Sequence, residues 1–488
     1  MSLLGIDIGT TGCKAVAYDL QGRQLAVSYR EYEIISSEKG FAELNSNDVW
    51  IKVLATIKEV AQQTKHNPVE ALSVSSLGEA MVPVSYDRKI LGNSILGTDC
   101  RGEEYIDQLL KTFTPYEVYK RTGNLPGAFY SISKLMWIKN NRNELYRNTD
   151  FFLSWADFVC FMLGGKPVTN NSLASRTLLL DLETGNWSEE LLSASGLEVT
   201  KLAPPCPSGN HLGFVKKDLA MKLGLKGNVA IISGGHDQCC AILGSGIKNG
   251  SQSAMYGLGT FICVAPVWPR MPDIKYMFQK NMHIEPHVVP GSFITFIYNQ
   301  SGGALIKWFR NVFGGKQSTY SGLFEEIPCS HNSIIVLPKF GATGPPEFDT
   351  GNQGCFSGLT LSHSRGDILQ AILEGTAFYV KDCFEKSDKV FAQTNTLIAS
   401  GGGSVSDKWL QITADILDRN IIRNKTTEAS SLGAAILAGI GNKKFSSFDE
   451  AVDSMVQEDY VFHPDRSKTD YYKNKFEQYK TLSIFLSP

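Results

Sequence analysis

Short apolar runs typical of strands alternate along this chain with longer amphipathic stretches typical of helices. The runs SLLGIDIG (2–9) and CKAVAYDL (13–20) predict two strands joined by a Gly/Thr turn. Residues 46–64 have apolar positions at helical spacing, with Ser46 or Asn47 as the expected cap. Further on, VAIISGG (229–235) predicts a buried strand that ends in glycines. Repeated alternation of this kind predicts an α/β fold.

The strand–turn–strand pattern of the N-terminus returns in the second half of the chain. AMYGLGTFICVAP (254–266) has the same order of features as GIDIGTTGCKAVAYD (5–19), and we interpret the two as copies of one phosphate-binding hairpin. Between them, GSGIKNGSQ (244–252) has the composition of a turn. We therefore expect an N-terminal domain, 1–247, and a C-terminal domain, 248–488, that ends in a polar helical tail.

Composition excludes several classes of protein. A chain of 488 residues is too long for one core, and 43% hydrophobic with 20% charged residues is typical of a soluble globular protein. The net charge of −2 does not indicate a partner among nucleic acids or membranes. The ten cysteines show no C-x-x-C spacing, and no signal peptide is evident, so we expect a reduced cytoplasmic protein.

The first turn carries candidate phosphate chemistry. Asp7 ends the first predicted strand, Thr10 and Thr11 lie in the turn, and Lys14 begins the second strand. Exposed backbone N–H groups and hydroxyls in such a turn can cradle a phosphate, and a neighbouring carboxylate can hold a hydrated Mg²⁺ ion. A plain hairpin turn explains the same residues equally well. The motif is not a Walker A loop, since G-x-x-x-x-G-K-[ST] is absent.

The stretch ISGGHDQCCAILGSG (232–246) places four residues that can bind metal within five positions. Zinc sites draw their ligands from separated pairs, and no such spacing appears here. We therefore expect Cys239 and Cys240 to lie in a buried helix as small apolar residues. His236 is interpreted as a polar neighbour, and Asp237 is a possible general base.

Several motifs in order resemble the FGGY family of carbohydrate kinases, in the actin and hexokinase superfamily. They are FYSISKLMWIKNN (129–141), GCFSGLTLSHSRGDILQAILE (354–374), ASGGGSVSDKWLQITADIL (399–417) and EASSLGAAILAGIG (428–441), and the resemblance extends from Leu3 to about Gly441. It implies two RNase-H-like, actin-like ATPase domains around a cleft. It also implies ATP-dependent transfer of phosphate to a hydroxyl of a sugar or polyol, the small-molecule partner.

The resemblance assigns roles to individual residues. GGHDQ is similar to the family's G-D-Q motif, which makes Asp237 the catalytic base and Gln238 a substrate contact. A carboxylate can take the proton of a hydroxyl that attacks a phosphate. Asp7 would hold Mg²⁺. The residues expected to bind ATP are Thr10, Thr11, Lys14, Gly259, Thr260, Gly302, Gly303, Gly402, Gly403 and Ser404.

The substrate wall departs from the family's patterns. SSLGEAMVPVS resembles G-Q-M-H-G of xylulose kinases and N-Q-R-E-T of glycerol kinases. Glu79 matches the carboxylate of the glycerol-kinase motif, but the arginine before it and the Met-His pair of xylulose kinases are both missing. In LGTDCRG, Asp99 is retained while Gly97 replaces an aromatic residue, and Phe129 lies where glycerol kinases carry tyrosine. Glu79, Asp99 and Phe129 are the expected substrate contacts. A carboxylate in this wall would repel a sugar acid.

These features favour a short ketose, such as a xylulose-type pentulose, as the substrate. Glycerol or another short polyol, a tetritol or a tetrulose, is the alternative. A non-catalytic actin-like ATPase switch is the alternative class, and a dehydrogenase is disfavoured because no G-x-G-x-x-G motif follows a strand. The resemblance leaves a homodimer as a possible assembly. A second departure, Ala342–Gly344 in place of the family's charged residues, has no assigned role.

Overall fold

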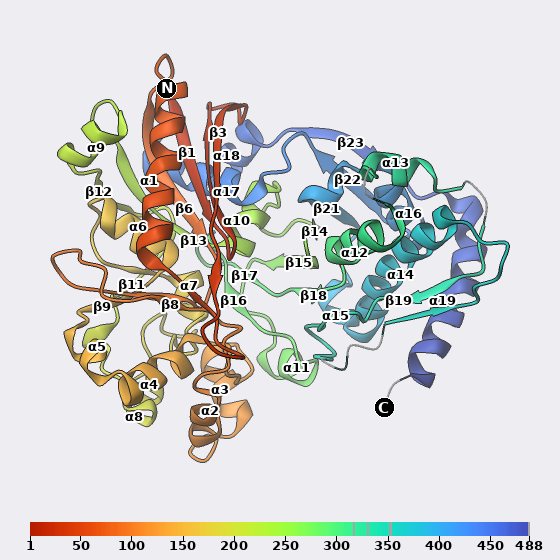
Figure 1. Cartoon of the computed structure of the whole chain (residues 1–488), viewed down its shortest axis with the longest axis horizontal. Coiled ribbons are helices and arrows are strands. Elements are labelled where there is room, and N and C mark those ends of the chain that lie inside the picture. The colour runs from red at the N-terminus through yellow and green to blue at the C-terminus, as the bar shows by residue number, and fades with distance from the viewer. Residues whose placement is uncertain (316–317, 329–330, 350, 352–353, 487–488) are drawn as a thin grey trace.

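The computed structural model describes residues 1–315, 318–328, 331–349, 351 and 354–486. Two large sheets, one in each half of the chain, organise the molecule (Figure 1). The first sheet has the order β12 (His211–Phe214), β13 (Ala230–His236), β6 (Val69–Ser76), β1 (Ser2–Ile8), β2 (Gly12–Tyr18), β3 (Gln24–Glu31).

Three central strands of this sheet run parallel and end together. Ile8 of β1 pairs with Ser76 of β6, and Ser76 pairs in turn with His236 of β13. The outer strands β2, β3 and β12 are antiparallel to their neighbours. The residues that follow β1, β6 and β13 are therefore gathered at one edge of the sheet.

The second sheet repeats this topology. Its strands are β16 (Glu285–Pro286), β17 (Phe293–Ile294), β15 (Ile262–Trp268), β14 (Ser253–Leu258), β21 (Thr396–Ser400), β22 (Asn420–Asn424) and β23 (Glu458–Phe462), with β18 (Ile297–Asn299) beside β15. The β14–β15 hairpin corresponds to β1–β2, and the parallel strands β21 and β22 follow β14 as β6 and β13 follow β1. The predicted repeat of a strand–turn–strand unit is thus present in space, and the α/β prediction is confirmed.

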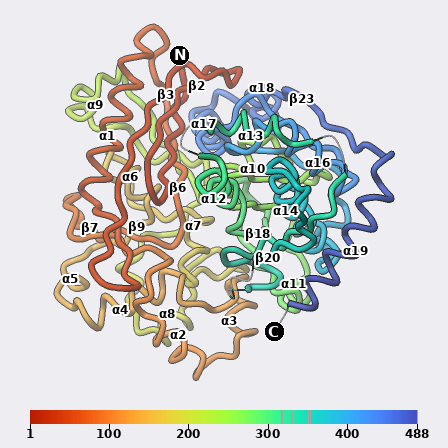
Figure 2. The backbone as a smooth tube through the Cα atoms, turned by 45° about the vertical axis from the view of Figure 1, so that its right-hand side comes forward, coloured from red at the N-terminus to blue at the C-terminus, as the bar shows by residue number. Residues whose placement is uncertain are grey.

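Helices cover both faces of each sheet, and one helical layer is shared. Helices α1 (Ser46–Gln63) and α6 (Trp155–Leu163) pack on one face of the first sheet. Helices α10 (Asp237–Gly244) and α17 (Ala429–Gly441) form one apolar cluster with the other face and with the near face of the second sheet. Both views show α10 and α17 between the two halves (Figures 1 and 2).

The α10–α17 layer depends on close backbone contact. A Cβ atom at Gly433 would lie 1.9 Å from the carbonyl oxygen of Cys240, and one at Gly244 would lie 2.0 Å from that of Ala429. Only glycine permits this approach. Because α17 comes from the C-terminal half, residues on both sides of the expected boundary at 247/248 pack against the first sheet.

The far face of the second sheet carries α12 (Gly303–Phe313), α14 (Arg365–Lys386) and α16 (Asp407–Leu417). The predicted helical tail is confirmed as α19 (Thr469–Phe485), which packs on α14. The cap of α1 was predicted at Ser46 or Asn47 and this is wrong: Asn45 caps the helix, because its side chain accepts the N–H groups of Asn47 and Asp48.

A group of smaller elements extends the first half below its sheet (Figure 1). It contains a separate apolar cluster and supplies one wall of the site. Its helices are α2 (Glu103–Leu109), α3 (Pro115–Thr122), α4 (Ser131–Asn141), α5 (Asn143–Asn148), α7 (Asn171–Ser175) and α8 (Glu189–Ser195). Its short strands are β4 (Ile34–Ile35), β5 (Glu43–Leu44), β7 (Met81–Val84), β8 (Ser94–Ile95), β9 (Phe151–Ser154), β10 (Thr169–Asn170) and β11 (Pro205–Cys206).

The remaining elements are short connections. They are α9 (Lys217–Leu223), α11 (Ile274–Gln279), α13 (Tyr320–Glu325), α15 (Asp388–Phe391), α18 (Phe448–Met455), β19 (Ile335–Leu337) and β20 (Cys355–Ser357). Among the described residues, no helix combines the length and apolar character needed to cross a bilayer.

Candidate active site

Three carboxylates lie where the parallel strands of the first sheet end. Asp7 is the last residue but one of β1, Glu79 follows β6, and Asp237 is the first residue of α10, directly after β13. The predicted position of Asp237 at a strand end is confirmed, and its side chain is 30% exposed. Three acidic side chains at one edge, one of them at a helix N-terminus, form a site that can hold a cation and accept a proton.

Asp7 is the residue of this group best suited to a metal ion. The Ser75 hydroxyl donates to its carboxylate at 2.8 Å, while Thr10 and Thr11 lie exposed in the following turn. Burial, and next the nearby Asp237 carboxylate, raise the pKa of Asp7 to about 7. Oxygen donors with uncompensated negative charge fit Mg²⁺.

Lys14 is held by a residue from the other half of the chain. Its ammonium lies 2.7 Å from the carboxylate of Glu428, the N-cap of α17. The structure thus places Lys14 on the first hairpin, as expected, but with an ion-pair partner that the sequence did not reveal.

A cavity of about 1110 Å³ lies over the second hairpin. It is bounded by the ends of β14 and β21 and by α12 and α16, and it brings together five residues predicted to bind ATP. These are Gly259, Thr260, Gly303, Gly402 and Gly403. Close packing requires two of the glycines: a Cβ at Gly303 would lie 2.5 Å from the carbonyl oxygen of Gly259, and one at Gly403 would lie 2.9 Å from Leu258 Cβ.

The other five residues predicted to bind ATP do not line this cavity. Thr10, Thr11 and Lys14 belong to the first hairpin, and two come from the second half of the chain. Gly302 is the N-cap of α12, and Ser404 is buried with its hydroxyl donating to the carbonyl of Gly401 at 2.7 Å. The structure therefore gives both a role in shaping the turns. Sequence reasoning missed the aromatic side of the cavity, Trp308 on α12 with Tyr320 and Phe324 on α13. An exposed tryptophan on an amphipathic helix was the available signal.

Glu79 is paired with an arginine from a distant element. Arg176, which follows α7, directs its Nη2 to Glu79 Oε1 at 2.5 Å and its Nε to the same oxygen at 2.6 Å. A Cβ at Gly78 would be 3.0 Å from Arg176 Cγ. This chain has no arginine directly before Glu79, but Arg176 pairs with the Glu79 carboxylate and packs beside Gly78.

Phe129 packs directly against Gly97 in the same wall. A Cβ at Gly97 would lie 2.9 Å from the carbonyl oxygen of Phe129 and 3.2 Å from its ring. The Phe129 ring is 42% exposed and lies 5.0 Å from the guanidinium of Arg176. The Phe129 ring therefore lies beside Gly97, where this chain has no side chain. Gln238 lies partly exposed beside Asp237 on α10.

The structure does not support Asp99 as a direct substrate contact. Its side chain has no exposed surface, and its carboxylate accepts from Arg101 Nε and Nη2 and from the N–H of Ala42. Lys134 of α4 donates to the carbonyls of Asp99, Arg101 and Ala128. Asp99 therefore secures the loop beside Phe129, and a sequence motif cannot distinguish this buried ion pair from a contact to substrate.

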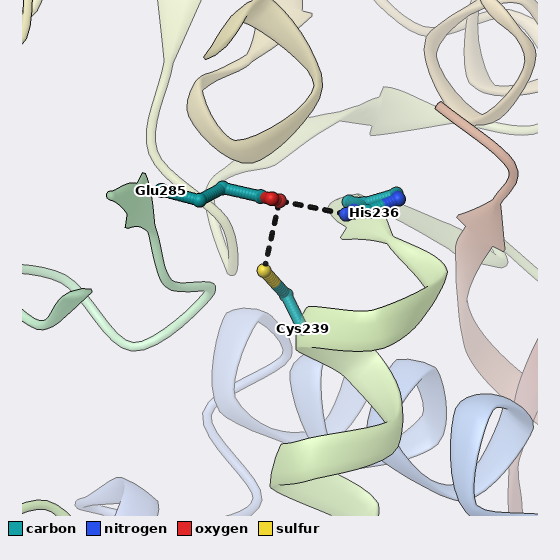
Figure 3. A group of neighbouring side chains, drawn as sticks. All are labelled: His236, Cys239 and Glu285. Atoms are coloured by element: carbon teal, nitrogen blue, oxygen red, sulfur yellow. Dashed lines mark hydrogen bonds and ion pairs between the residues drawn. The ribbon is translucent and has the colours of Figure 1, made fainter. Parts of the chain in front are cut away.

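His236 connects Asp237 to a buried glutamate that sequence reasoning missed. Its Nδ1 lies 2.7 Å from Glu285 Oε1, and its Nε2 lies 3.2 Å from Asp237 Oδ1. Figure 3 shows Glu285 reaching both His236 and Cys239, whose Sγ donates at 3.3 Å. Burial opposes the charge on the ring, yet Glu285 and Asp237 outweigh it and raise the pKa of His236 to about 9.

His236, Cys239 and Glu285 offer ligand atoms within 4.8 Å of one another, as a metal site requires. Their charges are already matched, because Arg176 Nη1 lies 3.5 Å from Glu285 Oε2 and His236 faces Oε1. Burial again opposes the charge, but His236 and Arg176 lower the pKa of Glu285 to about 2. A protonated imidazole has no lone pair for a metal, so the geometry favours a hydrogen-bonded network.

Comparison with known proteins agrees with this geometry. The model of the N-terminal domain of the FGGY family of carbohydrate kinases matches residues 2–244, and that of the C-terminal domain matches residues 276–441. The chain is 27% identical to a xylulose kinase of Bacillus subtilis, over 98% of this chain and 96% of that protein. It is 26% identical to a glycerol kinase of Thermococcus gammatolerans, over 95% of this chain and 93% of that protein.

The fold has solved relatives as well. The structure of a ligand-bound xylulose kinase from Lactobacillus acidophilus superimposes with a TM-score of 0.87 at 23% identity, covering 99% of this chain and 98% of that one. This likeness confirms the predicted pair of actin-like ATPase domains.

Proposed function

Because the chain belongs to the FGGY family of carbohydrate kinases, we propose that it transfers phosphate from ATP to a hydroxyl of a xylulose-type pentulose, with Asp237 as the general base. The observation that carries this proposal is the meeting of Asp237 and Asp7 at the ends of two strands of one sheet. One carboxylate is thereby available to the acceptor hydroxyl and the other to the charged phosphates.

In the proposed reaction Asp237 accepts the proton of the sugar hydroxyl as its oxygen attacks the γ-phosphorus. The hairpin turns at 9–12 and 259–261 would hold the phosphates from the two sides, with Thr10, Thr11 and Thr260 as hydroxyl donors. Lys14 would add positive charge on the first side. The adenosine would occupy the cavity lined by Gly402 and Gly403.

Asp7 would hold the Mg²⁺ ion, which when bound offsets negative charge on the phosphate oxygens. Closure of the halves, which we place at 1–247 and 248–488, would exclude water and limit hydrolysis of ATP.

The substrate wall supports a neutral polyhydroxy compound. Glu79 can accept hydrogen bonds from adjacent hydroxyls, Gln238 can bond another, and the Phe129 ring offers an apolar surface to the carbon chain. The likeness to xylulose kinases supports a pentulose. Glycerol or a tetritol is the second candidate, and the observation that favours it is the guanidinium–carboxylate pair of Arg176 and Glu79.

A coupled assay of ADP release tests the proposal, with D-xylulose, L-xylulose, erythrulose, erythritol, glycerol and gluconate as acceptors. We expect a ketose to stimulate turnover, gluconate to be inactive, and Asp237→Asn to lower kcat at least about a hundredfold with little change in the KM for ATP. If no acceptor stimulates ATP turnover and Asp237→Asn leaves it unchanged, a non-catalytic ATPase switch replaces the kinase.

A further inference from the structure

Five buried or half-buried side chains of alternating charge join the substrate wall to the base. In order they are Glu79, Arg176, Glu285, His236 and Asp237, and each neighbouring pair is in contact. They come from separate elements: the turn after β6, the residue after α7, β16, the end of β13 and the start of α10. A chain of ion pairs across so many elements fixes each member relative to the others.

His236 is the member that touches Asp237, and it is held from three directions. Its backbone N–H donates to the Ser172 hydroxyl at 2.9 Å, which fixes the main chain before α10. Each ring nitrogen faces a carboxylate oxygen, Nδ1 toward Glu285 and Nε2 toward Asp237. When both nitrogens carry a proton, the ring is a cation between two carboxylates, and the side chain is 7% exposed.

Resting on the proposed function, we propose that His236, clamped by Glu285, is a positioning residue that holds the Asp237 carboxylate in the orientation needed to accept the sugar proton. His236 occupies Oδ1 of Asp237, which leaves Oδ2 to face the acceptor hydroxyl. A charged ring attracts a carboxylate 3.2 Å away more strongly inside a protein than in water, and small displacements of a reacting group reduce rate strongly.

Glu285 connects His236 and Asp237 to the other half of the molecule. It lies on β16, at the edge of the second sheet, whereas His236 and Asp237 belong to the first. The orientation of the base therefore depends on a contact between the two halves. Cys239, whose thiol donates to Glu285 Oε1, adds a further restraint from α10.

The test uses the full-length protein, D-xylulose or the acceptor found in the screen, and the variant His236→Gln. Because a positioning residue acts on the chemical step, we expect kcat to fall about ten- to hundredfold while the KM values for sugar and ATP change less than about threefold. His287→Gln is the matched control, since His287 is an equally buried histidine whose ring nitrogens have no hydrogen-bond partner among the described residues. A kcat of His236→Gln within about twofold of the parent overturns the proposal.

Glu285→Gln provides a second arm, because it keeps the size and an accepting oxygen but loses the charge. If Glu285 acts through His236, the double variant His236→Gln/Glu285→Gln has about the same kcat as the less active of the two single variants. If the losses in kcat of the two single variants multiply in the double variant, Glu285 does not act through His236. Asp237→Asn separates the two hypotheses: normal kcat in that variant refutes the proposed base, whereas loss in Asp237→Asn with normal His236→Gln refutes the positioning role alone.

Discussion

Arg176 Nη2 lies 2.5 Å from Glu79 Oε1, although 97 residues separate the two along the chain. The guanidinium is almost fully buried, lies 5.0 and 5.1 Å from the ring centres of Phe129 and Tyr130, and also faces Glu285. One cation therefore balances two carboxylates of the site and supports an aromatic wall. Removing it would leave buried negative charge without a partner, which is costly.

Arg176→Met keeps the length of the side chain and removes its charge. We expect the KM for the sugar to rise about tenfold or more, because Glu79 loses the partner that orients it, while the KM for ATP changes little. Steady-state kinetics with each substrate varied in turn measures this. Arg142→Met is a control in the same half, since Arg142 is half exposed and its carboxylate partner lies 3.8 Å away. Equal changes in both KM values would contradict a role confined to the sugar side.

Phe129→Ala tests whether the Phe129 ring forms part of the substrate wall. Loss of the ring removes the apolar surface beside Arg176, so we expect weaker sugar binding, about tenfold in KM. Phe129→Tyr keeps the ring and should keep the KM within a few fold. The comparison is made by titrating sugar at saturating ATP, and a normal KM in Phe129→Ala would remove the ring from the substrate wall.

The repeated hairpins show which parts of this fold are predictable from sequence. Alternating apolar residues on strands, glycines at turns and a strand ending before Asp237 are local signals, and the structure follows them in both halves. The glycines at 259, 303 and 402 meet at one cavity because parallel strands end at the same edge of a sheet. Such edges are predictable once the order of strands is known.

The residues that sequence reasoning missed depend on tertiary contacts. Glu285 lies on a two-residue strand with no hydrophobic pattern around it and meets His236 across 49 residues. Arg176 follows a short helix, and its side chain packs against Gly78 where it pairs with Glu79. Asp99 was predicted as a substrate contact but forms a buried ion pair with Arg101. The same sequence motif is compatible with both roles.

The charge on His236 predicts a pH dependence. Glu285 from β16 and Asp237 from α10 raise its pKa to about 9, against burial and the Arg176 cation beside α7. The folded-state pKa lies above the ordinary value of about 6.5. The stability that the charged ring contributes is therefore fully present below pH 6.5 and is lost as pH rises through about 9.

We expect kcat and the midpoint of thermal unfolding of the parent to decline together above about pH 9. In His236→Gln this alkaline decline in kcat should be absent or much reduced. Initial rates and melting curves between pH 6 and 10 measure both. An unchanged alkaline limb in the variant would assign the transition to another group.

Lys475 of the C-terminal helix and Glu374 of α14 form an ion pair of 2.5 Å, with side-chain exposures of 4% and 1%. Lys475 also donates to the carbonyl oxygen and the side-chain oxygen of Asn332, so three elements converge on one ammonium. Lys475→Met strands the Glu374 carboxylate, whose pKa is already raised by burial. We expect a loss of about 3–5 kcal/mol in the free energy of unfolding.

The double variant Lys475→Met/Glu374→Gln should recover part of that loss, because a neutral amide replaces the stranded charge. Denaturant unfolding of the parent, the single variant and the double variant gives the three values. The pair lies on the outer side of the second sheet, against helices α14 and α19, so the KM for sugar should stay unchanged in folded protein. A double variant no more stable than Lys475→Met would show that lost hydrogen bonds to Asn332, rather than the stranded charge, dominate the effect.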